Sequence, residues 1–172
     1  MEKITLVVLS AGGSTRFEHS VKKQWLRVAD EPVWLFVTNR LSKLHNFDQV
    51  IVVSSPEEIS YMENFSDDFT FVAGGNSRQE SMQNALKHID SDYVMFTDVA
   101  RTCIPDNIIL DLIENKNKAK CIVPALSVDD TVILNGDTIN RDDVKLIQTP
   151  QLSHTKTLKK ALDTTTEFTD DS

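Results

Sequence analysis

Strand-like and helix-like segments alternate along this chain, and that alternation restricts the possible fold more than any other feature. Short apolar runs predict buried strands, and longer segments with apolar residues at three- and four-residue spacing predict helices. We expect strands over 4–9, 50–53, 69–72, 93–96 and 120–125, and helices over 32–44, 57–64, 77–89, 105–113 and 155–162. Strands that alternate with helices pair mostly in parallel, with helices on both faces, so we predict an α/β fold. The 172 residues, 40% of them hydrophobic, suffice for one domain over 1–172.

One region departs from the alternation and predicts a β-hairpin over about 127–148. Residues 131–134 lead into Asn135-Gly136, a dipeptide typical of a two-residue hairpin turn, and 138–145 form the returning side. A hairpin of this length is marginal alone in water. Its apolar residues Val132, Leu134 and Ile139 therefore need a surface that covers them.

The net charge of −8 argues against non-specific binding to nucleic acid. Cations nevertheless gather in one segment, which predicts a small anionic substrate rather than a polymer. They are Arg16, Lys22, Lys23 and Arg27.

The two cysteines, Cys103 and Cys121, have neither a partner nor a histidine at metal-ligand spacing. We therefore expect free thiols in a reducing, cytoplasmic compartment. No apolar stretch is long enough for a signal peptide or a membrane span, so no membrane partner is expected.

The loop after the first predicted strand has the physical outline of a phosphate-binding loop. It reads Ser10-Ala11-Gly12-Gly13-Ser14-Thr15-Arg16, and Lys23 follows. Small residues let backbone N–H groups approach a phosphate closely, and the two cations can neutralise it. The spacing matches neither the P-loop nor the dinucleotide fingerprint. Taken alone, it is equally compatible with a tight turn that carries an incidental arginine.

Two further loops lie at the carboxyl ends of predicted strands, where α/β sheets bind ligands. Residues 74–81 open a helix whose Ser77 and Glu80 form a capping box, and helix N-termini favour anions. In the other loop, Asp98 suits Mg²⁺ beside nucleotide phosphates, or else caps a turn. Arg101 suits a phosphate, or else forms a surface ion pair. Cations, glycines and one carboxylate indicate phosphoryl or nucleotidyl transfer, without a covalent nucleophile.

These motifs, in this order, resemble the 2-C-methyl-D-erythritol 4-phosphate cytidylyltransferase family. The matching segments are 10–16, Lys22-Lys23-Gln24, 74–81, 98–102, Asp130-Thr131 and Thr149-Pro150-Gln151. Details around 22–27 and 146–151 are similar to the version fused to 2-C-methyl-D-erythritol 2,4-cyclodiphosphate synthase. The resemblance implies a three-layer, Rossmann-like nucleotidyltransferase sheet with a protruding hairpin arm, and a homodimer formed through that arm.

The resemblance also implies a reaction, in which CMP passes from CTP to 2-C-methyl-D-erythritol 4-phosphate and pyrophosphate leaves. Arg16 and Lys23 would be catalytic, and Asp98 would bind Mg²⁺. The implied nucleotide site is Ser10, Ala11, Gly12, Gly13, Gly75, Asn76, Arg78 and Ser81, and the implied substrate site is Asp98, Arg101, Thr131, Arg141 and Thr149. Arg141 and Thr149 would reach the site from a second subunit.

Two alternatives stay open at this level. One is another alditol- or sugar-phosphate nucleotidyltransferase, such as a ribitol-5-phosphate cytidylyltransferase, because fold does not fix substrate. The other is a non-catalytic nucleotide-binding domain, because the family continues beyond 169–171 and this chain is expected to be truncated there. Lys22 stands where the family carries proline, and could add positive charge to the site.

Overall fold

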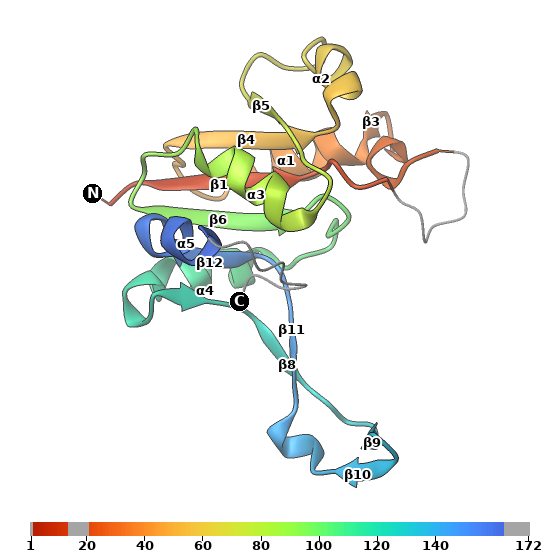
Figure 1. Cartoon of the computed structure of the whole chain (residues 1–172). Coiled ribbons are helices and arrows are strands. Elements are labelled where there is room, and N and C mark those ends of the chain that lie inside the picture. Colours follow the sequence, from red (N-terminus) through yellow and green to blue (C-terminus); the bar gives the residue numbers. More distant parts are fainter. Residues whose placement is uncertain (1, 14–20, 164–172) are drawn as a thin grey trace.

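The computed structural model describes residues 2–13 and 21–163, and its centre is a six-stranded sheet (Figure 1). The strand order is β5-β4-β1-β6-β12-β7. The first four strands run parallel, whereas β12 is antiparallel to both β6 and β7. The strands are β5 (Thr70–Ala73), β4 (Gln49–Ser54), β1 (Ile4–Leu9), β6 (Tyr93–Asp98), β12 (Gln151–His154) and β7 (Cys121–Ile122).

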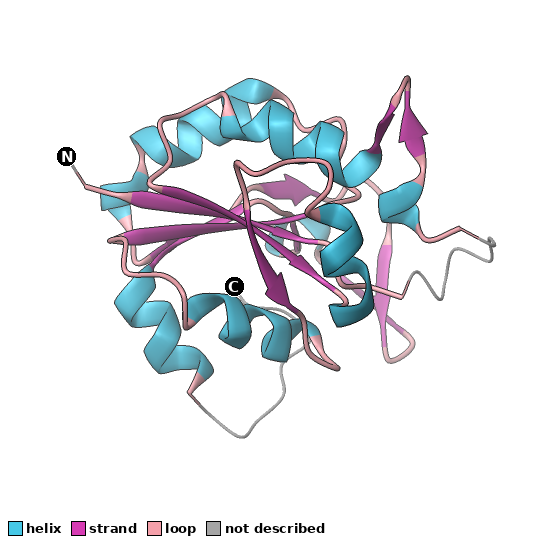
Figure 2. Cartoon of the chain, turned by 90° about the horizontal axis from the view of Figure 1, so that it is seen from above, coloured by secondary structure: helices cyan, strands magenta, loops and turns pink. Residues whose placement is uncertain are grey.

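Helices cover both faces of the sheet and give the molecule three layers (Figure 2). Along β1, Leu6 and Val8 belong to one buried cluster and Val7 to another, as the alternation of side chains along a strand requires. The first cluster includes residues of α1 (Val33–Ser42), α2 (Pro56–Met62) and α4 (Asp106–Glu114), and the second those of α3 (Arg78–Leu86) and α5 (Thr155–Leu162). The predicted α/β architecture with a mostly parallel sheet is confirmed.

Two sheet predictions were wrong. Strand β12 was not expected, because Gln151 and Ser153 are polar, yet both are buried between β6 and β7. The single strand predicted over 120–125 is two strands, β7 and β8 (Ala125–Ser127). Pro124 lies between them and has no N–H to donate to a ladder.

A ribbon (residues 125–147) extends away from the sheet (Figure 1). Its inner pair is β8 with β11 (Lys145–Ile147), and its outer pair is β9 (Val132–Leu134) with β10 (Asp137–Ile139). Asn135 and Gly136 have φ values of 55° and 95°, as the turn type favoured by Asn-Gly requires. Ile133 and Leu134 are 66% and 58% exposed, so the ribbon presents apolar side chains to its surroundings.

The remaining short elements within residues 2–13 and 21–163 are the hairpin of β2 (Arg27–Val28) with β3 (Glu31–Pro32) and three 3-10 helices. The 3-10 helices are η2 (Lys23–Trp25), η3 (Lys116–Lys118) and η4 (Arg141–Asp143). Cys103 and Cys121 are free, as expected, and both are exposed. Among the residues described, no helix has the length and apolarity needed to cross a bilayer.

Candidate active site

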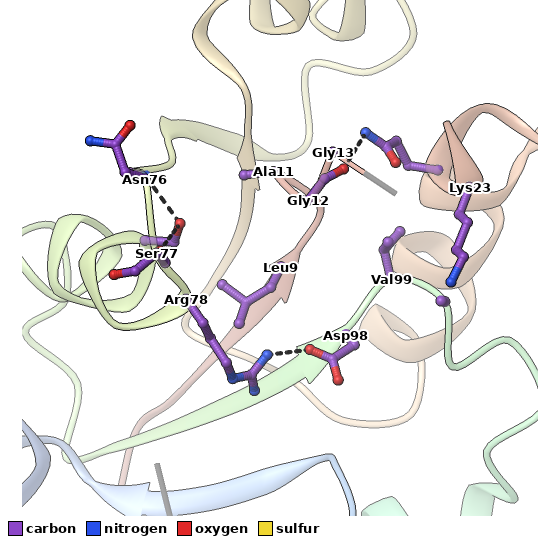
Figure 3. Close-up of a pocket in the computed structure, with 14 residues that line it drawn as sticks. Leu9, Ala11, Gly12, Gly13, Lys23, Asn76, Ser77, Arg78, Asp98 and Val99 are labelled. Atoms are coloured by element: carbon purple, nitrogen blue, oxygen red, sulfur yellow. Dashed lines mark hydrogen bonds and ion pairs between the residues drawn. The ribbon is translucent and has the colours of Figure 1, made fainter. Parts of the chain in front are cut away.

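A cleft of about 520 Å³ lies at the carboxyl ends of β1 and β6, where α/β sheets bind ligands (Figure 3). The three loops singled out from the sequence all contribute to it. Lys23 and Asn76 lie on opposite sides of the cleft, with Asp98 at the end of β6 between them (Figure 3). The lining residues are Leu9, Ala11, Gly12, Gly13, Lys23, Gln24, Gly75, Asn76, Ser77, Arg78, Ser81, Asp98, Val99 and Ala100.

The first two loops touch at Gly74. A Cβ atom added there would lie 2.4 Å from the Cβ of Ala11 and 3.1 Å from Ser81 Oγ. Real Cβ atoms do not approach each other so closely, so this contact requires glycine. The absence of a side chain at Gly74 therefore allows the glycine loop and the turn before α3 to approach each other closely.

The expected capping box opens α3 beside the cleft. Ser77 Oγ accepts a hydrogen bond from the Glu80 N–H at 3.1 Å. The Glu80 carboxylate accepts from the Asn76 N–H at 2.6 Å, one residue before the cap. Ser81 Oγ accepts from the Gly75 N–H at 3.0 Å and donates to Ser77 O at 2.9 Å. These bonds hold the turn 74–77 rigidly against a helix N-terminus, which carries partial positive charge.

Among the residues that the structure describes, Asp98 is the one acidic residue that lines this cleft. Its Oδ1 is paired with Arg78, and its Oδ2 accepts a hydrogen bond from Thr149 Oγ1 at 3.2 Å. No cluster of three or more potential metal-ligating side chains occurs in 2–13 or 21–163. A site of one carboxylate still suits Mg²⁺, because that ion is commonly held by one or two carboxylates together with substrate phosphates.

Two predictions about the substrate side need correction. Thr149 was expected to serve a second subunit, but its hydroxyl contacts Asp98 of its own chain. Lys22 does not add charge to the cleft, because its Nζ lies 3.0 Å from Glu58 Oε1 and 3.7 Å from Glu57 Oε1. The chain folds Lys22 toward α2, and neighbouring Lys23 faces the cleft instead.

The other predicted residues divide between the cleft, its surroundings and the ribbon. Ser10 lies beneath the loop, 1% exposed, and is absent from the lining of the cleft. Arg101 is exposed and donates to Gln148 Oε1 at 2.8 Å. Thr131 and Arg141 lie on the ribbon, outside the cleft of their own chain. Arg16, with Ser14 and Thr15, lies outside the described residues.

Sequence reasoning missed several contributors to the site. Gln24 lines the cleft although it is only 1% exposed, and its side chain donates to Glu58 Oε2 at 3.3 Å. Its position directly after Lys23 was the available signal. Glu58 itself carried no signal, because it lies in a different helix and meets residues 22–25 only in the folded chain.

The contact at Gly74 makes a prediction about stability. Gly74→Ala should lower the free energy of unfolding by about 1–3 kcal/mol, because the new methyl group cannot be accommodated without backbone movement. Gly12→Ala is the matched control, because nothing lies within 4 Å of a Cβ added there. Urea unfolding of both variants measures the difference. Equal stability of the two would contradict the role assigned to Gly74.

A mostly parallel sheet with a glycine loop, a capped helix N-terminus and a lone carboxylate around one cleft is typical of nucleotide-binding α/β transferases. The sequence profile of the 2-C-methyl-D-erythritol 4-phosphate cytidylyltransferase family matches residues 4–172. The chain belongs to this family. The match does not favour the alternative, a nucleotidyltransferase that acts on another alditol or sugar phosphate.

Similar proteins agree with this assignment. The chain is 58% identical over 172 residues to the bifunctional enzyme IspD/IspF of Aliarcobacter butzleri, and 52% identical to that of Campylobacter fetus. In each comparison the matched region covers all of this chain and 46% of the relative. The chain therefore spans about half the length of these curated relatives.

Solved structures show the same fold. The bifunctional IspDF of Campylobacter jejuni superposes with a TM-score of 0.92 at 48% identity, over 98% of this chain and 45% of that one. The 4-diphosphocytidyl-2C-methyl-D-erythritol synthase of Anaerococcus prevotii matches with a TM-score of 0.83 at 24% identity, over 99% of this chain and 81% of that one. The second likeness concerns the fold alone.

Proposed function

We propose that this chain transfers CMP from CTP to 2-C-methyl-D-erythritol 4-phosphate in non-mevalonate isoprenoid synthesis. The observation that carries the proposal is the single cleft in which Lys23, the glycine loop and Asp98 meet, in a chain that belongs to this family. A phosphate oxygen of the alcohol phosphate attacks the α-phosphorus of CTP. The bond from that phosphorus to the bridging oxygen breaks, and pyrophosphate leaves.

The proposed nucleotide site is the gap between the two small-residue loops. Ala11, Gly12 and Gly13 offer backbone N–H groups to phosphates on one side. Across the cleft, Gly75 and Asn76 hold the base and ribose, because the turn 74–77 is already fixed by its hydrogen bonds. Arg78 and Ser81 complete this side, and the buried Ser10 supports the loop from below.

The proposed chemistry is charge stabilisation. Lys23 faces the cleft and, with Arg16, stabilises negative charge on the five-coordinate phosphorus. The family generally depends on a divalent metal ion, and we assign Mg²⁺ to Asp98, which would hold it so that its charge offsets that of the nucleotide phosphates. Thr149 holds Asp98 in position, and Arg101 is assigned to the phosphate of the second substrate.

We further propose a homodimer formed through the ribbon. Five apolar side chains on it are at least 39% exposed, and a second copy of the chain would cover them. Arg141 and Thr131 lie outside the cleft of their own chain, so we assign them to the cleft of the partner. The five residues are Leu126, Ile133, Leu134, Leu146 and Ile147.

The relatives named bifunctional support two more proposals. The first is that this chain is part of a longer protein that also carries a cyclodiphosphate synthase domain. The second, a cytoplasmic location, is also favoured by the two free cysteines. A release of pyrophosphate that depends on both CTP and the alcohol phosphate tests the first activity. Cyclisation of the 2-phosphorylated form of that product by the complete protein, with release of CMP, tests the second activity.

The base preference gives a direct test of the nucleotide site. In the presence of Mg²⁺, calorimetry should show CTP bound at least about tenfold more tightly than ATP, because hydrogen bonds to a base edge reject a base of different shape and donor pattern. Asn76→Ala should reduce this preference more than it reduces the affinity for triphosphate. Equal affinities of the unmodified protein for CTP, ATP and GTP would contradict base recognition.

A further inference from the structure

One carboxylate, that of Glu58 in the first turn of α2, receives hydrogen bonds from residues on both sides of Lys23. The residues before and after Lys23 therefore bond to the same two oxygen atoms. These atoms belong to α2, which follows β4, whereas the segment 22–25 follows β1. The contacts are Lys22 Nζ at 3.0 Å and Trp25 Nε1 at 2.8 Å on Oε1, and Gln24 Nε2 at 3.3 Å and Ser55 Oγ at 2.7 Å on Oε2.

Aromatic packing fixes the same segment to the same helix. The ring of Trp25 lies 5.3 Å from that of Tyr61, three residues after Glu58, and 6.2 Å from that of Phe65. The fully buried Trp34 packs edge-on against Trp25 at 6.3 Å. Polar and apolar contacts therefore hold η2 in one orientation, with Lys23 on the side of the cleft.

The Glu58 carboxylate is well protected and charged. Its side chain is 14% exposed, and a carboxylate that accepts several hydrogen bonds in such a place is held firmly. Burial raises the pKa of the Glu58 carboxyl, but the hydrogen bonds just described outweigh it, so the pKa lies below its ordinary value. The neighbouring Glu57 is 70% exposed and lies 3.7 Å from Lys22.

We propose that Glu58 is a positioning residue for nucleotidyl transfer, which holds the segment 22–25 so that the Lys23 ammonium group stays in the cleft. Glu58 does not line the cleft and touches no reacting atom. It acts through Lys23, and the proposal therefore rests on the proposed function. A displacement of about 1 Å at a charge-stabilising group can cost a large factor in rate, so a residue outside the site can govern turnover.

Glu58→Gln tests the proposal with little change of shape. The amide keeps one acceptor oxygen and replaces the other with an NH₂ group, which cannot accept a hydrogen bond. Either the pair Lys22 and Trp25, which share Oε1, or Gln24 on Oε2 therefore loses its acceptor. We expect kcat to fall roughly tenfold or more, with KM for CTP changed less than about threefold, because Lys23 acts mainly on the transition state. Glu57→Gln is the matched control and should stay within about twofold of the unmodified enzyme.

Two readouts separate positioning from a general loss of stability. When Lys23 is already replaced by alanine, adding Glu58→Gln should lower kcat by less than about twofold. The effects of two substitutions that act through the same group are not additive. Acrylamide quenching should increase in Glu58→Gln, because the buried Trp34 is inaccessible and the other tryptophan of the sequence, Trp25, lies on the segment that Glu58 holds.

The measurements use the complete protein well below its unfolding temperature. A lowered Tm with unchanged kcat, or the same loss of kcat with and without Lys23, would overturn the proposal. If Glu58→Gln does not fold, Lys22→Met serves as the second variant, because it removes one of the three donors that the segment 22–25 offers to Glu58. It should lower kcat severalfold, and an unchanged kcat would again overturn the proposal. An unmodified enzyme that releases no pyrophosphate would instead refute the proposed function.

Discussion

Replacing Lys23 by alanine is expected to lower kcat by roughly two orders of magnitude, with a much smaller change in the affinity for CTP. Lys23 faces the cleft from the side opposite Asn76, near the end of β6, where the phosphates of a bound nucleotide would lie (Figure 3). A cation there meets more negative charge in the five-coordinate transition state than in the ground state. Arg16→Ala is expected to act in the same direction.

Steady-state kinetics and calorimetry with CTP test this pair of expectations. Arg27→Ala is the matched control, because Arg27 lies in the same basic segment but is exposed and bonded to the backbone of Asp30. It should leave kcat within about twofold of the unmodified enzyme. A raised KM with unchanged kcat in Lys23→Ala would show that Lys23 only binds the ground state.

Mixing Lys23→Ala subunits with Arg141→Ala subunits should restore about one quarter of the unmodified activity, although each variant alone is nearly inactive. Half of the dimers formed at random are mixed. In each of these, the cleft of the Arg141→Ala subunit has its own Lys23 and receives Arg141 from its partner. The basis is the position of Arg141 in η4 of the ribbon, outside the lining of the cleft of its own chain. The ribbon extends away from the sheet (Figure 1).

The recovery depends on exchange of subunits, so exchange must be shown separately by mass spectrometry of differently tagged chains. A mixture of Lys23→Ala with Arg16→Ala subunits is the control, because both residues are assigned to the same chain's cleft and no intact site can form. Confirmed exchange without recovery in the first mixture would show that Arg141 does not serve the partner.

Local chemistry was readable from the sequence alone. The apolar run at 4–9, the capping box of Ser77 and Glu80, and the Asn135-Gly136 turn are each decided by neighbours within a few residues, and each is present in the structure. The convergence of three strand-end loops was also predictable, because parallel strands place their carboxyl ends at one edge of a sheet.

Other features depended on contacts between distant segments. Strand β12 has too little apolar character to be predicted, and it exists because β6 and β7 provide hydrogen-bonding partners on both sides. Thr149 contacts Asp98, 51 residues earlier, because the chain returns to β6 where β12 begins. Lys22 and Lys23 are adjacent in sequence, yet Glu58 draws the first toward α2 while the second faces the cleft. The sequence determined which chemical groups are available and the order in which they occur. The tertiary structure alone decided which lysine faces the cleft, because side-chain direction depends on partners that only the folded sheet and helices bring into contact.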